Sequence, residues 1–243
     1  MNSVIQLLRD DANYYGEIGK RYLSNSDIGK LLSNPKMYGV PEPDNVNFAK
    51  GRYFHQLILE PEKAANIKTI DSSSRNTKVY KDAVSAEGAE FMLLDKERKE
   101  IEALVKIMMS NIDFFDIIMK AGNVYEEPAV GMIKERLWKG KADIISDDII
   151  IDLKTTSSIK DFKYSAKKYN YDSQCYIYQK LFDKPLVFFV IEKQSGLMGM
   201  YRPSDEFIRQ GEYKVEDAIE VHDKFFSDGA PHDIENYYIK ETL

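Results

Sequence analysis

Two acidic side chains and a lysine lie close together in the stretch KGKADIISDDIIIDLKTT, residues 139–156. Asp152 and Lys154 are two residues apart, so both leave the same face if this segment is a strand. A turn at Asp147–Asp148 would fold the preceding strand back and bring Asp143 beside Asp152. Carboxylate oxygens are hard ligands suited to Mg²⁺ or Mn²⁺. The spacing therefore predicts a metal-dependent centre, in which Lys154 orients an attacking water or neutralises charge on a phosphodiester.

A plain salt bridge is the alternative explanation for this cluster, because an Asp-x-Lys triplet is common in strands. Two features favour catalysis. Asp143 lies near the end of the adjoining candidate strand, and the apolar run Ile149–Ile151 delivers Asp152 and Lys154 from the interior of a sheet.

The elements that must position these residues can be predicted from periodicity and turn signals. Strands are expected at 123–133, 136–146 and 148–156, and a hairpin at 186–203 turns at Gln194–Gly196. Helices are expected over 24–35, 47–64, 88–120, 160–182 and 205–226. The polar stretch 66–86 is suited to a mobile loop, and the sequence leaves open whether it is ordered. Because hairpin strands are antiparallel and a helical crossover permits a parallel pair, the pattern predicts an α/β fold with a mixed sheet.

The length and composition suit one globular domain over 1–243. Its expected parts are a mainly helical 1–121, a catalytic sheet with a crossover helix over 122–203, and a C-terminal helix and tail over 204–243. The net charge of −6 argues against nonspecific coating of nucleic acid, but it permits a local basic channel. Cys175 is the single cysteine and is expected to be a buried thiol. With neither a signal peptide nor a membrane span evident, the cytoplasm is the expected compartment.

Five segments, one of them the strand pair already described, occur in an order that is specific when taken together. They are LSNSDIGKLLSNPKMY (23–38), GRYFHQLILEPE (51–62), YEEPAV (125–130), the strand pair KGKADII and IIIDLKTT, and QCYIY (174–178). With these segments the chain resembles the PD-(D/E)xK nuclease superfamily, and within it the phage and prophage exonucleases of the exodeoxyribonuclease VIII (RecE-like) group. Ala142 replaces the proline of the name-giving motif, and the cysteine set of the related iron–sulfur nucleases is absent.

The resemblance implies a restriction-endonuclease-like core, with a mixed central sheet flanked by helices, and a role for each matching residue. The implied ligands of Mg²⁺ or Mn²⁺ are His55, Asp143, Asp152 and the carbonyl of Leu153. Lys154 would activate water or stabilise charge, and Gln174 and Tyr178, four residues apart on one helical face, would position the DNA backbone or the lysine. The earlier strand supplies Glu126 or Glu127; alternation turns only one inward, and we favour Glu126.

Candidate DNA contacts are Arg52, Lys160 and Lys163, with Lys50, Lys167 and Lys168 as further cations near them. The alternative for the lysine run is an ordinary solvated face. His222, His232 and Trp138 are expected to have structural roles.

By resemblance, the expected activity is an exonuclease that degrades the 5′-ended strand from duplex DNA ends and supplies single strand to a recombinase. The implied assembly is a homo-oligomeric ring around DNA in a bacterial or phage-infected cell. The alternatives are an endonuclease or single-strand nuclease of the same fold, and a catalytically silent module that binds DNA ends or a partner. An acidic DNA mimic is disfavoured, because the key acids lie in apolar strands.

Overall fold

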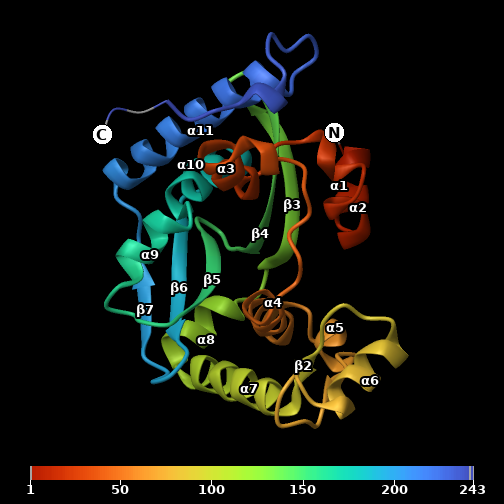
Figure 1. Cartoon of the computed structure of the whole chain (residues 1–243). Coiled ribbons are helices and arrows are strands. Elements are labelled where there is room, and N and C mark those ends of the chain that lie inside the picture. Colours follow the sequence, from red (N-terminus) through yellow and green to blue (C-terminus); the bar gives the residue numbers. More distant parts are fainter. Residues whose placement is uncertain (1, 241, 243) are drawn as a thin grey trace.

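The computed structural model describes residues 2–240 and 242, and its centre is a five-stranded sheet with the strand order β3-β4-β5-β6-β7 (Figure 1). The strands are β3 (Val124–Ile133), β4 (Arg136–Ile145), β5 (Ile150–Thr156), β6 (Leu186–Glu192) and β7 (Met198–Tyr201). The β5–β6 pair is parallel and the other three pairs are antiparallel. Hairpins join the antiparallel strands, and a helical crossover joins the parallel pair. The predicted α/β fold with a mixed sheet is therefore confirmed.

Helices cover both faces of this sheet, and β6 shows why. Its alternate residues point to opposite sides, with Phe188 and Val190 in one apolar core and Phe189 and Ile191 in the other. The first core is closed by α3 (Asn25–Ser33), α9 (Phe162–Lys168), α10 (Tyr171–Phe182) and α11 (Asp205–Phe225). The second is closed by α4 (Val46–Leu59), α7 (Asp95–Ser110) and α8 (Ile112–Ile118). A strand buried on both faces reads as a continuous apolar run, as LVFFVI does.

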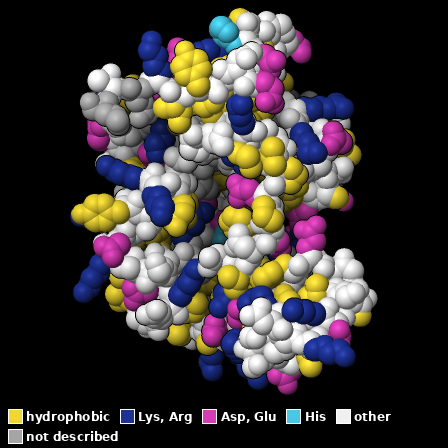
Figure 2. All heavy atoms as spheres, in the orientation of Figure 1, with side chains coloured by type: hydrophobic (Ala, Val, Ile, Leu, Met, Phe, Trp, Pro, Cys, Tyr) yellow, Lys and Arg dark blue, Asp and Glu magenta, His cyan; other side chains and the backbone are white. Residues whose placement is uncertain are grey.

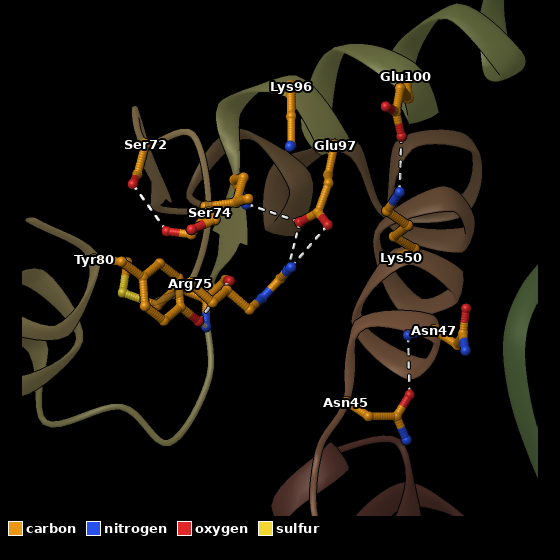
Figure 3. A network of polar contacts seen from close by, with 12 residues as sticks. Asn45, Asn47, Lys50, Ser72, Ser74, Arg75, Tyr80, Lys96, Glu97 and Glu100 are labelled. Carbon is orange, nitrogen blue, oxygen red and sulfur yellow. Dashed lines mark hydrogen bonds and ion pairs between the residues drawn. The ribbon is translucent and has the colours of Figure 1, made fainter. Parts of the chain in front are cut away.

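The interpretation of 66–86 as a mobile loop was wrong. This segment holds β1 (Thr69–Ile70), parallel to β2 (Leu93–Leu94), and α6 (Lys78–Glu87), and it follows α5 (Pro61–Ala65). Tyr80 and Ile70 anchor a small apolar core of their own. The Arg75 guanidinium donates to both carboxylate oxygens of Glu97, at 3.0 and 2.5 Å (Figure 3). These long-range contacts order a segment whose local sequence is polar.

Three predicted helices are interrupted, and one of them also begins later than expected. The helix expected from residue 88 begins at Asp95, because Gly88 ends α6 in the left-handed conformation (φ 61°). The crossover helix is broken at Asn170, which is also left-handed (φ 57°) and separates α9 from α10. The helix expected over 88–120 is also divided at Asn111, between α7 and α8, and the helix expected over 47–64 is divided at Glu60, between α4 and α5. The remaining predicted strands and helices lie where they were expected, within a few residues.

The first residues of the chain also form structure that periodicity did not indicate. These elements are α1 (Asn2–Leu8), α2 (Asp11–Tyr15) and a 3-10 helix at Gly19–Arg21; two other 3-10 helices lie at Pro35–Met37 and Ile234–Asn236. Among the helices of the described residues, none combines the length and apolar character that crossing a membrane requires.

Candidate active site

The two predicted carboxylates meet where β4 and β5 part. These strands pair at Ile144–Ile151 and Ile145–Ile150, so the next residues along, Asp143 and Asp152, face each other as the strands separate. The side chain of Asp143 bridges the gap, because its Oδ2 accepts a hydrogen bond from the backbone N–H of Leu153 (2.8 Å). Both carboxylates are buried, and Asp152 is only 2% exposed. The turn that the sequence predicted thus brings the two acids together.

Lys154 lies on the same face of β5 as Asp152, and its Nζ is 2.5 Å from Asp152 Oδ2. The ammonium group also lies over the ring of Tyr171, 4.9 Å from its centroid. Burial alone would lower the pKa of Lys154, but Asp152, Tyr171 and Asp143 outweigh burial and leave that pKa raised. Lys154 is therefore a cation at neutral pH, and this favours charge stabilisation over proton abstraction.

Gln174 and Tyr178 reach the site from α10, and each holds a different strand. Gln174 Nε2 donates to Asp152 Oδ1 (2.5 Å) and so orients this carboxylate. The Tyr178 hydroxyl donates to the carbonyl of Lys141 (2.9 Å), two residues before Asp143. Its ring lies so close to β4 that a Cβ added at Gly140 would be 2.9 Å from Cε1. Neither side chain donates a hydrogen bond to Lys154 among the described residues, and both hold acid-bearing strands. Their other expected role, positioning the DNA backbone, stays a prediction.

His55 and Glu126 complete the cluster from two further elements. His55 extends from α4, with Nδ1 3.4 Å from Asp143 Oδ2 and Nε2 2.8 Å from the carbonyl of Leu153. Glu126 is opposite Asp143 in the β3–β4 register and has a left-handed backbone (φ 50°). Of the two glutamates considered, Glu126 therefore lines the site, whereas Glu127 pairs with Arg9 at 2.8 Å.

The ionisation of these groups reflects crowding of acids in a buried place. Burial, followed by the charge of Asp143, raises the pKa of Glu126 to about 8. Burial also raises the pKa of Asp152 despite the neighbouring Lys154. For Asp143, burial is outweighed by His55, and its pKa is lowered; the same contact raises the pKa of His55 to about 9 against the effect of burial. In the absence of metal, the protein therefore keeps protons on groups from which a bound cation could displace them.

The donor set fits a divalent cation. One ligand atom each from His55, Glu126 and Asp143 lie within 4.8 Å of one another. Asp152 is not a member of this close group, and its buried Oδ2 is paired with the Lys154 ammonium group at 2.5 Å. Carboxylate oxygens, with an imidazole and the nearby carbonyl of Leu153, are the ligands that Mg²⁺ and Mn²⁺ accept. Of these groups, the sequence indicated Glu126 for catalysis and not as a metal ligand.

A pocket of about 370 Å³ opens over the cluster. Figure 2 shows this face of the molecule hollowed near its centre, with acidic and hydrophobic side chains around the hollow. Sequence reasoning missed several residues of its wall, namely Asp11, Tyr14, Tyr15, Gln56, Glu60 and Lys141. Lys141 Nζ lies 2.5 Å from Asp11 Oδ1 and 4.7 Å from the Tyr14 ring centroid, which fastens α2 over the site. The i, i+2 spacing of Lys141 and Asp143 on β4 was the signal available for this lysine.

The predicted DNA-contact residues are only partly brought to this pocket. Arg52 lines its rim and pairs with Asp44 (2.5 Å). Lys50 pairs with Glu100 on α7 (2.7 Å; Figure 3). Lys160 and Lys163 are exposed outside the pocket, on or next to α9.

The residues expected to be structural are found away from the site. His222 packs edge-on against Tyr38, and His232 stacks near Phe225. Cys175 and Trp138 are fully buried in the core.

Comparison with known proteins gives one family and a similar fold. The model of a family described as "PDDEXK-like domain of unknown function (DUF3799)" matches residues 36–231. A crystal structure of a "putative exonuclease" from Eubacterium rectale aligns with a TM-score of 0.64 at 18% identity, covering 96% of this chain and 95% of that one. A phage-related exonuclease from Haemophilus somnus 129PT aligns with a TM-score of 0.37 at 15% identity, covering 84% of this chain and 94% of that one. No curated protein matches at a significant level.

Proposed function

Because the chain belongs to the family of PDDEXK-like domains designated DUF3799, we propose that it is a metal-dependent deoxyribonuclease that hydrolyses phosphodiester bonds from the ends of duplex DNA. The observation that carries the proposal is the convergence of Asp143, Asp152 and Lys154 with His55 and Glu126 at the base of one pocket. A largely buried group of three potential anions and two potential cations would be costly without a ligand or a reaction that uses it.

Each residue has a role that follows from its contacts. His55, Glu126 and Asp143 would hold a divalent ion, with Asp152 and the Leu153 carbonyl beside them. When bound, such an ion stabilises charge on the phosphoryl oxygens and lowers the pKa of the attacking water. The Lys154 ammonium group stabilises the negative charge that develops on the phosphoryl group as water attacks.

Gln174 and Tyr178 act by holding the acidic residues in place. Gln174 keeps Asp152 in one orientation, and Tyr178 holds β4 where Asp143 leaves it. A small displacement of either carboxylate would reduce the rate, because the donor atoms must match the reacting phosphate closely.

The finer features of the proposal rest on the resemblance to the RecE-like exonucleases. They are degradation of the 5′-ended strand, delivery of the exposed strand to a single-strand annealing recombinase, and a homo-oligomeric ring around DNA. The similar fold of the Eubacterium rectale protein, which is described as an exonuclease, agrees with an end-directed activity but does not bear on polarity.

Digestion of linear and covalently closed circular duplex DNA tests the proposal, with Mg²⁺, with Mn²⁺ and with EDTA. Metal-dependent loss of the linear DNA alone is expected. Cutting of the circular DNA would indicate an endonuclease and not an exonuclease. No cutting of either DNA would indicate a catalytically silent binding module.

Variants then test the assignment of the site. Asp152→Ala and Lys154→Ala should each lower cleavage by about 10³-fold without unfolding the protein. Lys106→Ala, which removes an exposed lysine from α7, is the matched control and should cleave like the wild type. Activity that survives both site variants would refute the assignment.

A further inference from the structure

A second cavity is lined by residues of α9, β6, β7 and the start of α11, and it shares no lining residue with the catalytic pocket. Figure 1 shows where these four elements lie in the fold. Its volume is about 220 Å³, and four of its ten lining residues are aromatic. The rings that line it are those of Phe162, Phe188, Tyr201 and Phe207. Cavities of this kind accept flat apolar groups, because aromatic walls offer stacking faces.

Cations surround this cavity without carboxylate partners. Lys163, Lys167 and Arg202 line it, and none of them has a carboxylate within 4.0 Å among the residues that the structure describes. No acidic residue belongs to the described lining. By contrast, Lys214 and Lys134, which flank the same layer of helices, are paired with acids at 2.6–2.9 Å. In a protein of net charge −6, such an unneutralised group of cations is suited to a polyanion.

Two exposed tyrosines, Tyr164 on α9 and Tyr169 at its C-terminal end, lie near these cations but outside the lining of the cavity. Lys163 lies over the ring of Tyr164 (5.0 Å to the centroid), and Lys168 lies over the ring of Tyr169 (5.6 Å). These rings are 64% and 56% exposed, although tyrosine usually buries its ring. Alternating cations and exposed rings form the arrangement that binds single-stranded nucleic acid, since phosphates meet the cations and bases stack on the rings.

One side chain connects this cavity with the catalytic centre. The ring of Tyr171 is 5.4 Å from that of Phe188 and 6.1 Å from that of Phe162, which both line the cavity. The same ring also lies near the catalytic lysine, with its centroid 4.9 Å from Lys154 Nζ. A DNA strand bound along α9 would therefore be separated from the catalytic lysine by the ring of Tyr171.

We propose that this cavity binds an unpaired nucleobase of single-stranded DNA, with the flanking phosphates held by Lys163, Lys167 and Arg202. The inference rests on the proposed function for the source of the strand, which would be the end of a duplex that the nuclease has opened or shortened. An acidic peptide or a lipid headgroup would use the cations but would leave the aromatic wall without a stacking partner.

Binding of a fluorescein-labelled 20-nucleotide oligothymidylate, measured by anisotropy in EDTA, tests the proposal. The double variant Lys163→Ala/Arg202→Ala should bind at least tenfold more weakly than the wild type. The slope of log affinity against log salt should fall by about 1.4, the value for two lost phosphate contacts. The matched control is Lys78→Ala/Lys81→Ala, which removes two exposed lysines from α6 and should bind within twofold of the wild type.

A 20-nucleotide abasic strand separates base recognition from charge attraction. The wild type should bind it about tenfold or more weakly than oligothymidylate, because stacking on the aromatic wall is lost. Equal affinity for the two strands would overturn the base site and leave only a basic patch. Equal weakening by the α9 and α6 double variants would overturn the location.

Cleavage of bis(p-nitrophenyl) phosphate keeps this inference separate from the proposed function, since the small diester cannot span both pockets. If the wild type cleaves the diester but Lys163→Ala/Arg202→Ala binds oligothymidylate normally, the inference fails and the nuclease stands. If neither the diester nor DNA is cleaved but the variant loses oligothymidylate binding, the nuclease fails and the single-strand site stands.

Discussion

Raising the pH should destabilise the metal-free protein through His55. The pKa of this residue is raised from 6.5 to about 9 in the folded state, because Asp143 lies 3.4 Å from its ring. A raised pKa stabilises the fold fully below the unfolded value of 6.5, and this stabilisation is lost as the pH rises through 9. At 1.36 kcal/mol for each pH unit between the two values, the contribution is on the order of 3 kcal/mol.

Urea unfolding in EDTA at several pH values between 5.5 and 10 measures this contribution. The informative quantity is the difference in unfolding free energy between the wild type and His55→Gln. This difference should be largest at pH 5.5 and should shrink by about 3 kcal/mol by pH 10. The pKa of Glu126 is raised to about 8, so its contribution to the stability of the fold also falls as the pH rises. This contribution is present in both proteins, and subtracting their unfolding free energies reduces its influence.

A difference that stays constant between pH 5.5 and 10 would refute the reasoning, because the His55–Asp143 pair would then contribute no pH-dependent stability. The variant Asp143→Asn provides the check. Without the neighbouring charge, His55 should lose its raised pKa, and the shrinking difference should vanish in this background.

Three further predictions concern other parts of the molecule. Gly211→Ala should destabilise the protein by about 3 kcal/mol in thermal or urea unfolding, because the new Cβ would be 2.1 Å from the carbonyl oxygen of Asp172; wild-type stability would contradict the close approach of α11 to α10. Arg75→Ala should cost about 2–3 kcal/mol, since it leaves Glu97, 7% exposed, without its cation. Faster tryptic cleavage between 66 and 94 would report this loss, and an unchanged digestion rate would argue against it. Binding of Mg²⁺ at pH 7 should release between one and two protons, because donors with pKa values of about 9 and about 8 must deprotonate. Calorimetry in two buffers of different ionisation enthalpy measures this number, and zero release would contradict the ligand set.

The centre of the site could be predicted because its geometry follows from local rules. Because Asp152 and Lys154 are two residues apart on one strand, their side chains leave the same face of the sheet. The short turn between the strands places Asp143 opposite Asp152. Alternation also predicted that only one of two adjacent glutamates faces the site, without deciding which, and the favoured Glu126 is the one in the pocket. Its left-handed backbone could not have been foreseen, since a non-glycine residue rarely adopts that conformation in a strand.

The parts that escaped prediction depend on contacts between distant segments. The short helix α2 is fastened by Lys139 and Lys141, which lie more than 120 residues away along the chain. The segment 66–86 reads as a loop because its own residues are polar, and its order comes from Glu97 on α7. No local pattern encodes such pairs, so only the folded structure reveals them.

The parting of β4 and β5 has a consequence for anyone who needs an inactive form of this protein. At that point the Leu153 N–H has a carboxylate for its partner, where an ordinary ladder would supply a carbonyl. Asp143 therefore repairs a break in the sheet as well as lining the pocket, and Asp143→Ala would leave a buried amide unpaired. A loss of activity in that variant would mix damaged architecture with lost chemistry. The Lys154 side chain does not satisfy a backbone group in this way. An inactive variant for trapping DNA complexes is therefore better made at Lys154.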